Sequence, residues 1–281
     1  MVYAMKKIII NADDFGYSKE NNEAIKLGFE AGIITSTSLI ANMDGFENAV
    51  FEVLPQIPKI EIGLHFNIIE GKSLTNQSML CDKNGFFNNN YLQIILKSQN
   101  KEFLKQVEIE FRAQIEKVLK YSKISHIDSH VHTGSIPNIH KLITKLAKEY
   151  NIEYLRNPYE KFYFVISKSF NLKFLVNILK NILLNIFSLT NKKETKTNNY
   201  FIGVLYTGMM NEKTIINGLK RIKKENSLTE IIFHPTLNKS KKNNYKEFKI
   251  TQNPNFKKEI EELGFMLTNH FNYAQDLEQN S

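Results

Sequence analysis

The 281-residue sequence predicts an α/β fold, specifically an irregular (β/α) barrel, from two observations. Short runs rich in β-branched residues alternate along the chain with longer segments of helical periodicity, which is typical of a parallel sheet covered by helices. About seven such units follow one another, and this number suits a complete or irregular barrel better than a small open sheet. We therefore expect a single domain over residues 1–281.

The first half of the chain supplies four predicted strands and three predicted helices. The strands are expected at 6–12, 33–42, 60–68 and 125–132. The helices are expected at 19–32, 46–54 and 101–122. Ser18 is a suitable N-cap for the first helix and Gly32 ends it, while Pro55 stops the second. A polar loop containing Asn and Gly spans about 70–90.

The second half continues the alternation with one interruption. Strands are expected at 152–158, 200–206, 229–235 and 265–269. Helices are expected after Pro137 and at 211–224 and 255–263. The interruption is a helical insert at about 161–195, in which apolar residues recur at helical spacing from Leu172 to Phe187. Lys173, Lys180 and three Asn residues lie on the opposite side, so the insert is predicted to be an amphipathic helix.

Two interpretations of this insert remain open. Its apolar face packs on the barrel or on a dimer partner, or residues 170–188 touch a membrane surface or a lipid-linked substrate.

Composition excludes several classes of protein. The formal net charge is +8, but no aromatic-basic nucleic-acid motif, P-loop or GxGxxG pattern occurs. The single cysteine, Cys81, excludes an internal disulfide framework and a thiolate metal cluster. The N-terminal apolar run reaches charged residues too early for a signal peptide, and no uncharged run approaches the ~20 residues that span a bilayer. We expect a cytoplasmic protein.

Polar and charged residues gather at the ends of the predicted strands, where α/β barrels place their active sites. The set comprises Asp13, Asp14, His65, His126, Asp128, His130, His132, Arg156 and His234. A carboxylate and two imidazoles can bind a divalent metal ion and leave coordination positions open. Such an ion also explains the adjacent Asp13 and Asp14, because its charge lowers the cost of keeping both ionised. Ser129 lacks a glycine elbow, so metal-assisted hydrolysis is the predicted chemistry.

Five segments resemble a known family in content, order and spacing: "NADDFGYS", "GLHFNI", "HIDSHVH", "YLRNP" and "IIFHP". They resemble the YdjC-like carbohydrate deacetylases, which include chito-oligosaccharide deacetylases and hopanoid-biosynthesis-associated deacetylases. The resemblance covers residues 6 to 270. It implies a TIM-like irregular barrel, often homodimeric, that removes an N-acetyl group from an amino sugar by a metal-activated water. Magnesium is the metal that the family implies, while zinc or another transition metal also suits the ligands.

The resemblance also implies a role for each site residue. Asp14, His65 and His130 would be metal ligands, and Asp13 would be the general base, although adjacency leaves open which Asp does which. His234 would protonate the departing amine, and Arg156 would hold Asp13. His126 and Asp128 would orient His130, and His132 would be second shell or substrate-binding.

The chain departs from the family pattern at Gly134, where many members have a further His. Its insert resembles the hopanoid-associated branch, which implies a lipid-linked or membrane-proximal glycan, possible peripheral contact with the inner membrane face, and a glycolipid or small-molecule substrate. Two rivals to the deacetylase remain: a metal-dependent amidase or esterase with a non-sugar substrate, and a sugar- or metal-binding protein without turnover.

Overall fold

The structure is a computed structural model that describes residues 6–165, 172–192 and 194–279. Parts of the predicted insert, 166–171 and 193, lie outside the described residues.

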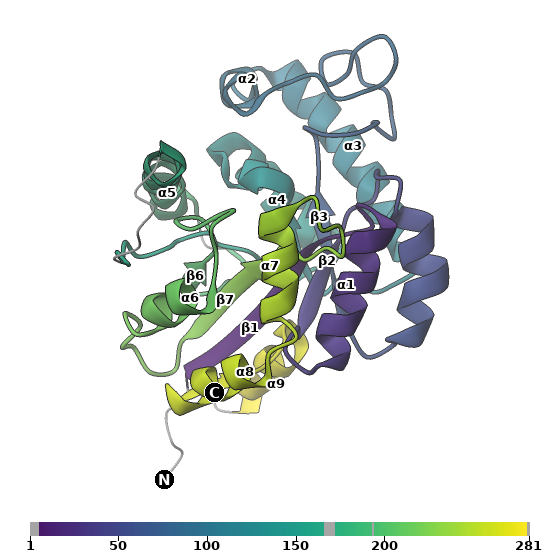
Figure 1. Ribbon diagram of the computed structural model, residues 1–281. Coiled ribbons are helices and arrows are strands. Elements are labelled where there is room, and N and C mark those ends of the chain that lie inside the picture. The colour runs from purple at the N-terminus through teal and green to yellow at the C-terminus, as the bar shows by residue number, and fades with distance from the viewer. Residues whose placement is uncertain (1–5, 166–171, 193, 280–281) are drawn as a thin grey trace.

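Within the described ranges, eight strands form one parallel sheet (Figure 1). They are β1 (Lys6–Phe15), β2 (Ser36–Leu39), β3 (Glu61–Phe66), β4 (His126–Ser129), β5 (Tyr154–Leu155), β6 (Tyr200–Ile202), β7 (Leu228–Phe233) and β8 (Phe265–Leu267). The order is β5-β4-β3-β2-β1-β7-β6, and β8 also pairs with β1. All of these pairings are parallel, so the carboxyl ends of the strands share one edge.

The segments next to the two outer strands, β5 and β6, are joined by hydrogen bonds, which bring these strands close together. Asn198 donates to the carbonyl of Asn157 at 2.6 Å and accepts from its N–H at 2.8 Å. The N–H of Phe201 donates to the carbonyl of Tyr159 at 3.0 Å. The sheet is therefore curled toward closure, and the predicted irregular barrel is confirmed.

Helices cover the outer face of the sheet (Figure 1). They are α1 (Lys19–Glu30), α2 (Tyr91–Lys97), α3 (Lys101–Leu119), α4 (Pro137–Glu149), α5 (Leu172–Thr190), α6 (Glu212–Leu219), α7 (Lys242–Ile250), α8 (Pro254–Glu262) and α9 (His270–Gln279), with short helical turns η1 (Asn48–Val53), η2 (Leu54–Gln56) and η3 (His130–Ser135). The Ser18 hydroxyl accepts from Asn21 N–H and caps α1, as predicted. In the core, Phe66 stacks on Phe111 with ring centroids 3.9 Å apart.

Four local expectations are corrected. The fourth strand ends at Ser129, three residues earlier than expected, because η3 follows with Val131 and His132 at positive φ. The predicted 46–54 helix is a π-helical turn followed by a 3-10 turn. The predicted 211–224 helix ends at Leu219. Helices α2, α7 and α9 were not predicted.

Helix α5 turns its row of asparagines toward the protein. Asn177 donates to the carbonyls of Leu205 and Thr207 at 3.2 and 3.1 Å. Asn181 and Asn185 donate to the carbonyl of Glu160 at 3.1 and 2.9 Å. The apolar stripe is consequently turned outward, so its predicted packing on the barrel is wrong, whereas contact with a dimer partner or a membrane stays a prediction.

Glu160 connects α5 to the end of β6. Its buried carboxylate accepts N–H groups of Gly203, Val204 and Leu205 at 3.3, 2.7 and 2.9 Å. Burial, only partly opposed by these N–H donors, raises the pKa of Glu160 to about 7.

This shift predicts a pH dependence of stability. The unfolded carboxyl titrates near 4.5, so the folded state binds the extra proton between pH 4.5 and 7. The stabilisation that Glu160 contributes is complete below pH 4.5 and falls by about 3 kcal/mol as the pH rises through 7. Urea unfolding should show that Glu160→Gln, which mimics the protonated acid, lacks this fall. Glu153→Gln, at an exposed position, should keep the wild-type profile. Equal slopes in wild type and Glu160→Gln would contradict the assignment.

Candidate metal centre

The end of β1 turns two adjacent carboxylates in different directions. The pairing register of β1 with β2 shifts between Ala12 and Phe15, and Asp14 has a φ of 68°. This left-handed conformation interrupts the regular alternation of the strand. Gly16 follows with a φ of 88°, and a Cβ there would lie 2.9 Å from the carbonyl oxygen of Ile40. The local backbone thus separates Asp13 from Asp14.

Asp14 faces two imidazoles from neighbouring strands. Its Oδ1 atom lies 3.5 Å from Nε2 of His65, on β3, and 3.2 Å from Nδ1 of His130, which follows β4. This oxygen is buried and has no hydrogen-bond partner among the described residues. Burial would raise the pKa of Asp14, but the nearby His130 ring, together with His234 and His65, holds it well below its ordinary value. One carboxylate oxygen and two imidazole nitrogens converge here.

Each imidazole has a carboxylate behind it. Nδ1 of His65 lies 2.7 Å from Asp128, and Nε2 of His130 lies 3.0 Å from Glu70. Such partners fix the tautomer, so Nε2 of His65 and Nδ1 of His130 are left facing Asp14. This donor set, with its orphaned buried oxygen, fits a divalent metal ion.

Glu70 was not among the predicted site residues, because it lies in the polar loop expected at about 70–90. Its carboxylate also accepts the Tyr17 hydroxyl at 2.6 Å. Asn67 accepts the N–H groups of Ile69 and Glu70 and so fixes the local turn. An Asn followed three residues later by an acid is the available signal, but it does not reveal that His130 lies beside it.

Asp13 faces a buried arginine, and one of its oxygens also lies within 4.8 Å of a His65 ring nitrogen. Arg156 donates to both Asp13 oxygens at 2.7 and 2.8 Å, and Asn11 donates to one of them at 2.7 Å. Burial would raise the pKa of Asp13, but Arg156, with His65 and His234, holds it well below its ordinary value. Asp13 is therefore ionised at neutral pH and rigidly held.

The same guanidinium joins three acids. Arg156 lies 2.5 Å from Asp128 and donates to Glu230 at 2.7 Å, in addition to Asp13. All four side chains are at most 2% exposed. Because Asp128 also holds His65, this network connects Asp13 to one of the candidate ligands.

His234 stands next to Asp13 at the end of β7. Its Nε2 lies 3.9 Å from Asp13, and its Nδ1 lies 3.6 Å from Glu247 on α7. Helix α7 also fixes the backbone, since Glu247 accepts the His234 N–H and Asn244 donates to its carbonyl. Burial disfavours the charged ring, but Glu247 together with Asp14 and Asp13 raises the pKa of His234 to about 9. His234 therefore carries a proton at neutral pH.

The other two histidines of the predicted site, His126 and His132, lie in separate positions. His126 begins β4 instead of ending it, and it contacts Ser125 and Ser38. We expected His126 and Asp128 to orient His130; this was wrong, because Asp128 holds His65 and Glu70 takes the place beside His130. His132 lies on η3, where burial lowers its pKa to about 3.

A second trio, Glu61, His126 and His270, also brings metal-ligand atoms together. The two rings stack with centroids 3.8 Å apart and an interplanar angle of 17°. Nearly parallel rings cannot direct their in-plane lone pairs at one ion. Glu61 instead accepts the N–H groups of His270 and Phe271 and so caps α9.

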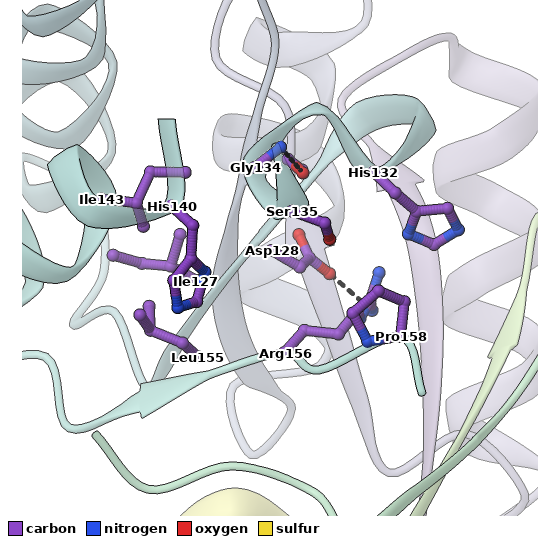
Figure 2. A pocket seen from close by; sticks show the side chains of 11 residues that line it. Ile127, Asp128, His132, Gly134, Ser135, His140, Ile143, Leu155, Arg156 and Pro158 are labelled. Carbon is purple, nitrogen blue, oxygen red and sulfur yellow. Dashed lines mark hydrogen bonds and ion pairs between the residues drawn. The ribbon is translucent and has the colours of Figure 1, made fainter. Parts of the chain in front are cut away.

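A small cavity lies behind the candidate metal centre. In Figure 2, Asp128 and Arg156 meet between His140 on one side and His132 on the other. The centre of a water molecule can occupy about 20 Å³ in it, so the cavity holds about one water. Gly134 lines it, and a Cβ there would lie 2.8 Å from Ser129 Oγ. The open side of the centre is where His130, Glu70 and His234 are partly exposed, so a larger ligand would have to approach from there.

The sequence profile of one family, described as YdjC-like protein, matches residues 7–272. The chain belongs to this family. Among similar curated proteins, a carbohydrate deacetylase of Clostridium beijerinckii is 38% identical over 148 residues, which is 52% of this chain and 58% of that protein. A carbohydrate deacetylase of Brevibacillus brevis is 35% identical over 148 residues, or 52% of this chain and 57% of that protein. The chain thus spans somewhat more than half the length of these relatives.

A solved structure supports the YdjC-like fold. A protein of Enterococcus faecalis named for cellobiose-phosphate cleavage superposes with a TM-score of 0.74 and 24% identity, over 95% of this chain and 98% of that one. At this identity the likeness establishes the fold alone.

The candidate ligands predict the metal content of this YdjC-like protein. His65→Ala or His130→Ala removes one of three donors, so we expect each variant to lose most of its metal after dialysis. Elemental analysis of protein loaded with one divalent ion measures this. His140→Ala, on α4, should bind metal like the wild type. Stoichiometric metal in both ligand variants would show that the ion binds elsewhere.

Proposed function

We propose that this protein is a metal-dependent N-deacetylase that hydrolyses the acetamide of an amino sugar or glycan. The observation that carries the proposal is the arrangement of an ionised carboxylate, Asp13, and a protonated imidazole, His234, beside the Asp14–His65–His130 trio. The relatives named carbohydrate deacetylase and the family membership support the same reaction.

The residues divide the work of amide hydrolysis. When bound by Asp14, His65 and His130, a divalent ion supplies Lewis acidity for water and for the acetyl carbonyl. Asp13, held by Arg156, accepts a proton from the attacking water. His234 donates its proton to the amine nitrogen as the C–N bond breaks. The products are acetate and the free amino sugar, so atoms and protons balance.

The identity of the ion is part of the proposal. We propose magnesium on the family resemblance, while two imidazoles and a carboxylate equally support zinc or another transition metal. We further propose a homodimer, which sedimentation equilibrium tests directly, and a lipid-linked sugar as one acceptor class.

The experiment that tests the reaction is an assay of acetate release. Metal-loaded protein should release acetate from N-acetylglucosamine oligomers or from acetylated glycolipid extracts. Release only from simple amides or esters would favour the amidase or esterase alternative. Sugar binding with no release from any of these substrates would identify a binding protein and reject the enzyme.

A further inference from the structure

Helix α5 exposes an apolar stripe to solvent. Seven of its large apolar side chains are at least 42% exposed: Leu172, Leu175, Val176, Leu179, Ile182, Ile186 and Leu189. In its most apolar 18-residue stretch the mean hydropathy is 1.5, and only 28% of that stretch is buried in the protein. By length and composition it is the one helix in the described residues that could cross a membrane. So large an apolar patch on one helix marks an interaction surface.

The outward orientation is determined by specific hydrogen bonds. Asn177, Asn181 and Asn185 recur at intervals of four and bind backbone carbonyls after β6 and β5. Asn185 also accepts the N–H of Glu160 at 3.0 Å. Rotating the helix to bury its leucines would turn these amides to solvent and leave the backbone carbonyls unpaired in an apolar interface. These hydrogen bonds therefore hold the apolar face outward.

The sequence that contains α5 is rich in positive charge. Between Glu160 and Glu194 the sequence contains no acidic residue and six lysines: Lys161, Lys168, Lys173, Lys180, Lys192 and Lys193. The segment is thus strongly cationic. An anionic surface would be attracted to it, whereas a second copy would bring two such segments together.

We propose that α5 docks this protein on an anionic phospholipid bilayer, with the helix lying along the surface. The leucine and isoleucine side chains enter the acyl boundary and the lysines meet lipid phosphates. Phe162 and Phe164, 58% and 44% exposed, extend the apolar surface. The asparagine bonds keep the opposite side of α5 on the protein, so the helix lies on the bilayer and does not cross it.

Docking also orients the candidate metal centre. Helix α5 rests on the segments that follow β5 and β6, which lie at the same sheet edge as Asp14, His65 and His130. Asn191 donates to the carbonyl of Ser135 at 2.9 Å, at the end of the turn that begins with His130. A docked α5 would thus hold this edge of the sheet close to the bilayer.

Vesicle flotation tests the docking without any substrate, so its failure leaves the proposed deacetylation untouched. We expect the full chain to float with phosphatidylcholine vesicles that contain phosphatidylglycerol, less with phosphatidylcholine alone, and less at high salt. Leu179→Asn with Ile186→Asn should lower the bound fraction about tenfold or more. The matched control is Leu92→Asn with Leu96→Asn on α2, where both side chains are also exposed.

Thermal melts of both double variants should match the wild type, because the substituted side chains point into solvent. Wild-type protein that does not float with anionic vesicles overturns the proposal. It is also overturned if the control variant loses flotation equally. A wild-type dimer that becomes monomeric in the α5 variant, with no flotation of either, would assign the stripe to a second copy.

Discussion

Replacing Asp13 by Asn should lower the rate of acetate release by about a thousandfold while the protein keeps its metal. An amide cannot accept the proton of the attacking water, and a general base contributes about 10²–10⁴ in rate. Asp13 is held by Arg156 and Asn11 and is not one of the three converging ligands, so we expect its substitution to leave Asp14, His65 and His130 in place. The measurement is the rate of acetate release together with elemental analysis of the same sample.

The matched control for this variant is Asp82→Asn. Asp82 is exposed and accepts backbone N–H groups with one oxygen, a role that an Asn carbonyl keeps. It should show the wild-type rate. An Asp13→Asn protein with an unchanged rate would remove Asp13 from the reaction, and loss of its metal would instead make Asp13 a ligand.

Replacing Arg156 by Met should be the most destabilising single change at the site. Without the guanidinium, the buried carboxylates Asp13, Asp128 and Glu230 face one another with no cation between them. Removing one partner of a buried ion pair costs about 3–5 kcal/mol, and here three acids lose theirs. The free energy of unfolding, measured in urea, should fall by at least that amount at pH 8.

The loss of unfolding free energy in Arg156→Met should be smaller at acidic pH. Unpaired buried carboxyls have raised pKa values, so the folded variant gains protons, and hence stability, as the pH falls. Arg112→Met is the control, because Arg112 is about one-third exposed on α3 and its ion pairs with Glu108 and Glu149 lie at the surface. We expect a cost of about 1 kcal/mol or less there. Comparable losses for the two variants would contradict the buried network.

Much of the fold follows from periodicity in the sequence. The eight predicted strand segments all contain a strand, and the helix after Ser18 begins at its predicted cap. The bounds of β4 could not be predicted, because the strand stops just before Val131 and His132 enter positive φ, a conformation that a β-branched residue such as Val rarely adopts. Helix α7 was missed because its sequence, "KNNYKEFKI", has little apolar periodicity.

The candidate site was predicted by residue type, and the Arg156–Asp13 pair was predicted correctly, but the carboxylate partners of the imidazoles were not. Strand ends brought Asp14, His65 and His130 together as expected, since parallel strands share one carboxyl edge. Which carboxylate holds which imidazole depends on side-chain directions in three dimensions. Glu70 comes from a loop, and Glu230 from the interior of β7, so neither could be assigned from local sequence.

The amphipathic pattern of α5 was predicted, but its direction was not. Helical periodicity defines two faces and does not state which one meets the protein. Here three Asn side chains donate to backbone carbonyls of Glu160 and Leu205. These hydrogen bonds decide which face of α5 meets the protein, and they are known only from the three-dimensional structure.

The most direct test of the central claim is acetate release as a function of added divalent metal. Protein stripped with a chelator is titrated with magnesium or zinc while it is incubated with N-acetylglucosamine oligomers. We expect negligible release from stripped protein and a rate that saturates near one ion per chain. A stripped protein that releases acetate at the full rate would contradict it.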